Sequence, residues 1–159
     1  MSTSSSARAY KYENETRCEA KGWEPHVDEE TTKVIDHALC AEIERAEAML
    51  EQIEEVEEAD APLYSRDTLR RASAFLKAQS VQAHKMYGAF APVPNIGIGP
   101  NGSVDLHWKR NDWELLVNIP ANDRELATYY GDDYGEQKIR GSIYQTTFDY
   151  GIVMWLMKN

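Results

Sequence analysis

The stretch PNIGIGPNGSVDLHWKRNDWELLVNIP, residues 94–120, changes the period of the sequence from helical to extended. Its apolar and polar side chains alternate, so that Val104, Leu106 and Trp108 fall on one side of an extended chain. The pair Asn101-Gly102 supplies residues that accept a positive φ, as a tight hairpin turn requires. We therefore predict antiparallel strands joined by short turns, with one face of the sheet buried.

Extended segments continue after this stretch. Residues 126–131 (LATYYG) are expected to form a fourth strand, and residues 138–144 (KIRGSIY) are a candidate fifth. The last segment, residues 146–159, is apolar on nearly all sides after a threonine that could cap a helix. This pattern favours a short helix buried against the sheet, with a final strand as the alternative.

Two helices are predicted before the sheet. Across residues 28–58 apolar side chains recur every three or four positions without an intervening Gly or Pro, which indicates one long amphipathic helix. A second helix is expected from Arg66, with Ser65 as its N-cap and Gly88 as its stop. Because the first helix is acidic and the second basic, we expect them to pack as an antiparallel hairpin.

Together these segments predict an α+β protein. A helical hairpin packs on a four- or five-stranded antiparallel β-meander, and a short helix ends the chain. At 159 residues the chain has the length of one domain. We expect a mobile polar tail over residues 1–24 and a single domain over residues 25–159. Within the domain we expect the helical hairpin over residues 25–88, the β-meander over 91–145 and the C-terminal helix over 146–159.

Charge is distributed unevenly along the chain. The whole sequence carries −10, whereas residues 28–60 hold thirteen acids against Lys33 and Arg45 and so carry −11. Direct contact with nucleic acid needs clustered basic side chains, so no nucleic acid binding is expected. No apolar run approaches the roughly 20 residues of a membrane-spanning helix, and the N-terminus lacks the apolar core of a secretory signal. The sequence therefore predicts a cytoplasmic protein without a membrane partner.

Four residues, Cys18, His26, His37 and Cys40, are the candidates for a metal site, since His37 and Cys40 are three positions apart on the first predicted helix. Their spacing matches no zinc-ligand pattern, so we expect neither a metal nor a cofactor. In a reducing compartment both cysteines are expected to be thiols. The sequence does not decide whether the four side chains meet.

Two clusters are candidate contact sites for a protein partner. Glutamates group opposite the apolar stripe of the long helix, which fits docking of a basic partner, mimicry of the charge spacing of DNA, or a solvated face. Tyrosines and aspartates gather late in the sheet, which fits a binding hot spot or a turn. The candidate partner-binding residues are Glu44, Glu47, Glu51, Glu54, Glu55, Glu58, Tyr129, Tyr130, Asp132, Asp133 and Tyr134.

A catalytic interpretation depends on Asp105, His107 and Lys109, which share the outward face of one strand. In this interpretation His107 is a general base oriented by Asp105, and residues 129–134 help to bind a ligand. No nucleophile with an identifiable oxyanion loop accompanies these residues, and polar side chains are what a solvated sheet face requires. We therefore do not expect an enzyme.

The segment from Phe75-Leu76 to about Gly141 resembles a widespread, largely uncharacterised set of small bacterial proteins. Their common pattern is a helix ending in F-L, then P-x-P-x-(I/V)-x-x-x-P-(D/N)-G-x-(I/V)-x-L-x-W and a meander. The resemblance implies an accessory protein of bacterial or phage origin, from a mobile or defence-type locus, and does not imply an enzyme. In this chain the anchors of the pattern are Pro92, Pro94, Gly102, Leu106 and Trp108.

These observations favour a non-catalytic protein-binding module that acts as an antitoxin, an inhibitor or a defence-system accessory subunit. The expected partner is a protein with a basic surface. Two alternatives remain open. One is a DNA mimic that acts through the acidic helix, and the other is a small enzyme or ligand-binding protein that uses His107 and residues 129–134.

Overall fold

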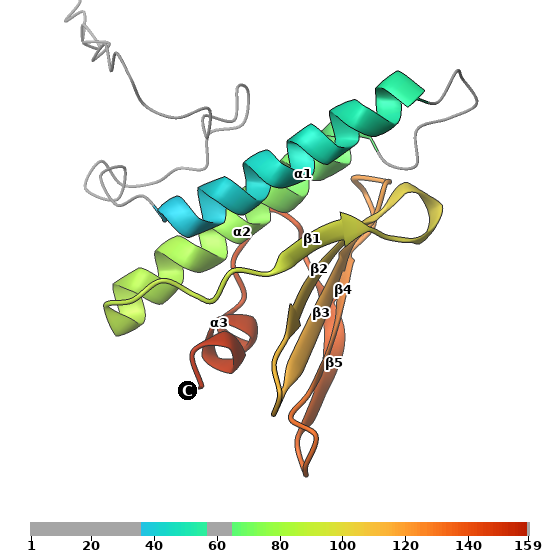
Figure 1. Ribbon diagram of the computed structural model, residues 1–159. Coiled ribbons are helices and arrows are strands. Elements are labelled where there is room, and N and C mark those ends of the chain that lie inside the picture. The colour runs from blue at the N-terminus through green and yellow to red at the C-terminus, as the bar shows by residue number, and fades with distance from the viewer. Residues whose placement is uncertain (1–35, 57–64, 159) are drawn as a thin grey trace, which may run out of the picture.

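The alternating segment forms three consecutive strands of a five-stranded antiparallel sheet in the computed structural model, which describes residues 36–56 and 65–158 (Figure 1). The strands lie side by side in chain order, from β1 to β5. This arrangement confirms the α+β class and the meander, and it establishes the fifth strand. The elements are α1 (His37–Val56), α2 (Arg66–Tyr87), β1 (Asn95–Ile98), the 3-10 turn η2 (Pro100–Gly102), β2 (Val104–Lys109), β3 (Glu114–Ile119), β4 (Ala127–Asp132), β5 (Lys138–Ile143) and α3 (Tyr150–Leu156).

Every second side chain of the central strands points into one buried layer. In the pairing of β2 with β3, Leu106 lies opposite Val117 and Trp108 lies opposite Leu115. All four side chains are buried, as the alternation predicted. The indole N–H of Trp108 donates a hydrogen bond to the carbonyl of Pro92 at 2.6 Å, so the proline-rich entry segment is fixed against the sheet.

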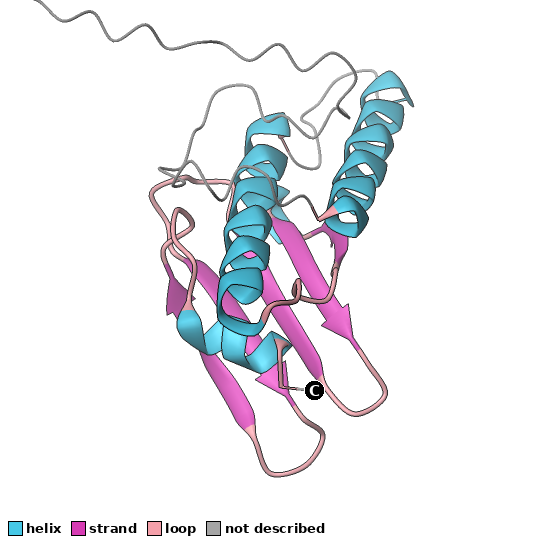
Figure 2. Ribbon diagram, turned by 90° about the vertical axis from the view of Figure 1, so that its left-hand side faces the viewer, coloured by secondary structure: helices cyan, strands magenta, loops and turns pink. Residues whose placement is uncertain are grey.

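The three helices cover this layer from one side of the sheet (Figure 2). Two contacts show that α1 and α2 run antiparallel, as predicted. Arg66 at the start of α2 pairs with Glu54 near the end of α1 at 2.6 Å. Near the other end of the pair, the Ser80 hydroxyl donates to the Asp36 carboxylate at 2.6 Å. The hairpin therefore packs along its length, and its apolar sides face the sheet.

The ends of the helices follow local chemistry. The Ser65 side chain accepts from the backbone N–H of Thr68 at 3.1 Å, and Gly88 ends α2 with a φ of 70°, so both predicted caps of α2 are confirmed. The predicted threonine cap of α3 is wrong. Asp149 caps this helix, because its carboxylate directly precedes the first turn and accepts from the N–H of Ile152 at 3.0 Å.

The connection from β1 to β2 differs from the predicted tight turn. Asn101 and Gly102 do have positive φ angles, 55° and 76°. They lie, however, in a longer connection over residues 99–103, which the N–H of Gly99 closes by donating to the Ser103 carbonyl at 2.8 Å. The predicted polar tail over residues 1–24, the first part of the predicted long helix and Glu58 lie outside the described residues.

Candidate interaction surface

No described element lies on the face of the sheet opposite the helices (Figure 1). Strand pairing arranges the side chains of this face in rows that cross the strands. One row crosses all five strands, because each of its members pairs with the next. It consists of Asn95, His107, Leu116, Tyr130 and Arg140. This outward face is therefore a continuous surface of mainly polar and aromatic side chains, with Leu116 among them.

Asp132 organises the β4–β5 part of the outward face. Its Oδ2 accepts the Tyr130 hydroxyl at 2.9 Å and pairs with the Lys138 ammonium at 2.9 Å, while its Oδ1 accepts the backbone N–H of Tyr134 at 2.8 Å. The hydrogen bond from Lys138 holds the pKa of Asp132 below its usual value, and the same bond raises the pKa of Lys138. Asp132 thus orients the Tyr130 side chain and fixes the backbone of Tyr134.

Tyr134 lies in the turn between β4 and β5, with a φ of 55°. The turn is built by Asp133, whose Oδ1 accepts the N–H of Gly135 at 3.0 Å and that of Gln137 at 2.9 Å. The hydrogen bond from Gln137 is the main reason why the pKa of Asp133 is lowered. Partial desolvation and the nearby Glu114 carboxylate raise the pKa of Tyr134, so its phenol stays protonated at neutral pH.

The predicted tyrosine and aspartate cluster is divided between the two faces of the sheet. Tyr130, Asp132 and Tyr134 meet on the outward face. Tyr129 points to the helix side, where its ring packs close to Gly141, and it is half-buried there. The structure therefore does not bring Tyr129 together with the other tyrosines, because neighbouring residues of a strand face opposite sides.

The outward residues of β2 have separate partners on β3. His107 Nε2 is 3.3 Å from the Glu114 carboxylate, and Asp105 accepts from the side-chain amide of Asn118 at 2.7 Å. Asp105 is therefore engaged across the strands rather than along its own strand toward His107. The catalytic interpretation needs Asp105 to orient His107, and this contact is not among those of the described residues.

Acidic side chains of α1 face the basic helix α2. Glu51 and Glu54 both pair with Arg66, at 3.8 Å and 2.6 Å. Lys77 is partly buried beside α1; this burial lowers its pKa, whereas Glu47 acts to raise it. Glu44 is half-buried and Glu55 is exposed. Seven acids against one arginine give residues 36–56 a charge of −6, while five bases against one acid give residues 65–87 a charge of +4. Much of the acidic charge is thus balanced within the hairpin.

Sequence reasoning missed a clamp on the β1 edge. Glu42 Oε1 accepts the backbone N–H of Ile96 at 2.8 Å, and Arg45 donates to the Ile96 carbonyl at 2.7 Å. Glu42 and Arg45 also pair with each other at 2.6 Å. Burial alone would raise the pKa of Glu42, but the hydrogen bonds from Arg45 and Ile96 lower it overall. Their i, i+3 spacing suggests only a local helix pair, so the contact with a distant strand has no signal in the sequence.

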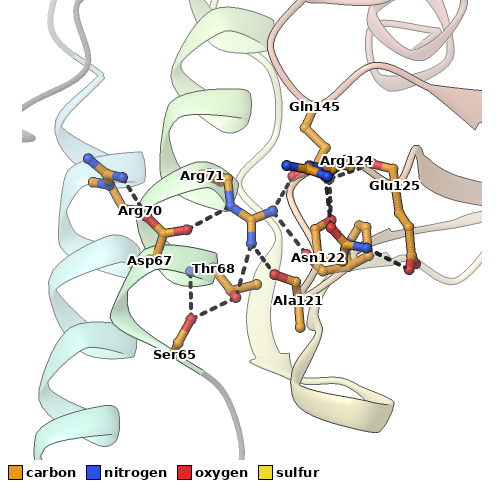
Figure 3. A network of polar contacts seen from close by, with 11 residues as sticks. Ser65, Asp67, Thr68, Arg70, Arg71, Ala121, Asn122, Arg124, Glu125 and Gln145 are labelled. Carbon is orange, nitrogen blue, oxygen red and sulfur yellow. Dashed lines mark hydrogen bonds and ion pairs between the residues drawn. The ribbon is translucent and has the colours of Figure 1, made fainter.

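Sequence reasoning also missed Arg71, which joins α2 to two distant segments (Figure 3). All five N–H groups of its guanidinium donate to acceptors, and three of these acceptors come from the β3–β4 connection and from the segment after β5. The acceptors are Asp67, Thr68, the carbonyls of Pro120 and Ala121, and Gln145. A saturated guanidinium has no donor left for a ligand. We therefore assign Arg71 a structural role.

An open hollow of about 270 Å³ lies beside Trp113 and Trp155. The ammonium of Lys158 stands 4.7 Å from the centre of the Trp155 ring and 3.5 Å from the Asp133 carboxylate. The chain itself thus places a cation at the aromatic and acidic side of this hollow.

Within residues 36–56 and 65–158 no group of three or more His, Cys, Asp or Glu side chains is placed to hold a metal. Cys18 and His26 lie outside this part of the chain. Cys40 is disulfide-bonded, so the expectation of a thiol at this position is wrong, and its sulfur is not available as a thiolate ligand. No described helix combines the length and the apolar character that crossing a membrane requires.

Comparison with protein-family models, with curated proteins and with solved structures gave no match.

Proposed function

We propose that this protein is a non-catalytic protein-binding module and that it contacts its partner through the β4–β5 part of the outward face. We call this part the tyrosine surface. It consists of Tyr130, Tyr134, Lys138 and Arg140, and the exposed Tyr144 directly follows the end of β5. The observation that carries the proposal is that one carboxylate holds the side chain of the exposed Tyr130 and the backbone of the exposed Tyr134, on a face that no described element covers.

Exposure and order occur together at this surface. Tyr130 is 41 % exposed, Tyr134 is 49 % exposed and Tyr144 is 70 % exposed. Aromatic side chains at this level of exposure offer large contact areas, and tyrosine is enriched among the residues that dominate binding energies. Because Asp132 already fixes Tyr130 and the backbone of Tyr134, less conformational entropy is lost when a partner binds. A preorganised aromatic surface of this kind supports protein binding.

The acidic helix is a weaker candidate for the contact. Glu51 and Glu54 already pair with Arg66, so a basic partner would have to compete with the protein's own arginine. The tyrosine surface has no such internal competitor at Arg140, which forms no ion pair with any other described residue. The proposal therefore places the main contact on the sheet and departs from the expectation of a basic partner surface.

The test uses a partner isolated from the native host with the full chain as bait, and then measures its affinity for purified variants by isothermal titration calorimetry. Tyr130→Ala should weaken binding about 30-fold, which corresponds to a hot-spot loss of about 2 kcal/mol. The matched control is Tyr87→Ala, which removes a tyrosine of similar exposure, 46 %, from the end of α2. This control should bind like the wild type.

A double variant, Glu44→Lys with Glu55→Lys, tests the acidic helix. Both side chains lie on α1, and neither forms an ion pair with another described residue, so the fold should survive. Unchanged affinity in this variant together with the loss in Tyr130→Ala would support the proposal. The opposite pattern would overturn it and place the contact on α1.

A further inference from the structure

The two edges of the sheet differ in how their backbone is satisfied. At the β1 edge, Glu42 and Arg45 occupy the outward N–H and C=O of Ile96, so this edge is closed at its centre. At the other edge, β5 pairs with β4 only. No described residue forms a backbone hydrogen bond with the outer side of residues 138–143. Strand β5 is therefore the open edge of the described sheet.

An open edge carries a row of unpaired N–H and C=O groups that can pair with another extended chain. The side chains of β5 determine which chain would fit. Lys138 and Arg140 stand on the outward face, two residues apart, and both are exposed. On the helix side Ile139 is half-buried, and the Tyr129 ring lies across Gly141. A strand added here would meet basic groups on one face and apolar groups on the other.

We propose that β5 receives an extended acidic segment of the partner as a sixth strand. Acidic side chains at alternate positions of that segment pair with Arg140 and Lys138, and the intervening apolar side chains pack against Ile139. This inference rests on the proposed function and names the mode of binding at the tyrosine surface. The Lys138 ammonium already pairs with Asp132 at 2.9 Å, so Arg140 is the cation with unused capacity.

The same charges select against other occupants of the edge. Basic side chains on an edge strand disfavour edge-to-edge aggregation, and they repel another basic strand. A second copy of this chain, added through its own β5, would bring Lys138 and Arg140 of both copies onto neighbouring strands. Like charges on neighbouring strands are destabilising, whereas an acidic strand converts the repulsion into attraction. Charge complementarity therefore favours an acidic partner segment over self-association.

The experiment uses the full chain, labelled with ¹⁵N, and three synthetic peptides. The peptide GEVEVTG alternates acidic and apolar residues. GKVKVTG has the opposite charge, and GEPEPTG keeps the acids but lacks two backbone donors. Titration with GEVEVTG to millimolar concentration should shift the amide signals of residues 138–143 and slow their hydrogen exchange. The lysine peptide and the proline peptide should leave these signals unchanged, because pairing needs both the charge and the N–H groups.

A charge exchange tests the role of Arg140. Arg140→Glu should bind GEVEVTG at least tenfold more weakly and should gain affinity for GKVKVTG. The matched control is Arg110→Glu, which makes the same charge change at an exposed position in the β2–β3 turn. It should behave like the wild type with both peptides.

Three results would overturn the inference. They are a response to GEVEVTG that maps to α1, no response at all, or a dimer of the free chain in sedimentation that dissociates in Arg140→Glu. Tyr130→Ala could weaken binding of the native partner while the acidic peptide leaves the amide signals of β5 unchanged. In that case only the strand-addition mode fails. If Tyr130→Ala has no effect on the native partner, the proposed function fails as well.

Discussion

Replacing Arg71 by lysine should destabilise the protein, although the positive charge is kept. The guanidinium donates five hydrogen bonds, and an ammonium has only three donors, so at least two acceptors lose their partner. At about 0.5–1.5 kcal/mol for each hydrogen bond, Arg71→Lys should lower the free energy of unfolding by about 1–3 kcal/mol. The carbonyls of Pro120 and Ala121 are the acceptors that we expect the lysine ammonium to reach least well.

The measurement is urea denaturation of the full chain, with the midpoint and the slope fitted together. Arg70→Lys is the matched control, because among the described residues the exposed Arg70 forms an ion pair with Asp67 alone. Its cost should be below about 0.5 kcal/mol, as is usual for surface ion pairs. Hydrogen exchange should also become faster in residues 120–125 of the Arg71 variant only, since their anchor is weakened. Equal destabilisation by the two substitutions would refute the assignment of Arg71 as the anchor.

Three further predictions concern the sheet. Trp108→Ala removes a buried indole and should lower the free energy of unfolding by about 3–5 kcal/mol in chemical denaturation, whereas a loss below 1 kcal/mol would contradict its place in the core. Gly131→Ala should cost about 1–3 kcal/mol, because the added Cβ would lie 2.8 Å from Ile139, and Gly135→Ala, where the nearest such atom is 3.4 Å away, is the comparison. The pKa of Asp132 is lowered in the folded state, so its stabilisation is present above its ordinary pKa of 3.8 and is lost as the pH falls below that value. The difference in stability between wild type and Asp132→Asn should therefore shrink below about pH 4, and a difference that grows with acid would show the opposite sign.

The elements that the sequence predicts well are those set by local chemistry. The apolar side chains at alternate positions of residues 104–108 and 115–119 can share one buried face only in an extended chain, and the structure has β2 and β3 there. Ser65 and Gly88 act within one turn of the helix that they bound, so their roles are visible in the sequence. Asp149 competes with nearby threonines for the same role, which is why the cap of α3 was predicted incorrectly.

The contacts that the sequence could not predict join distant segments. Arg71 reaches acceptors 49, 50 and 74 residues away, and Arg45 reaches the carbonyl of Ile96 51 residues away. Nothing in the local pattern distinguishes these arginines from solvated ones. Of the predicted tyrosine cluster, Tyr130 and Tyr134 lie on the same face as Asp132, whereas Tyr129 lies on the other face. The strand register decides the face of each side chain, and a run of neighbouring tyrosines does not reveal that register.

The clamp of Glu42 and Arg45 on Ile96 has a consequence for stoichiometry. A sheet with two open edges can take a strand on each side, and repeated addition then gives chains of molecules. Closing the β1 edge removes one of these two positions, so among the described elements a continuous sheet can grow only at β5. Each molecule then accepts one strand and ends the sheet on its other side. Complexes formed by strand addition should accordingly be one-to-one and finite, because the sheet cannot be extended further through the β1 edge.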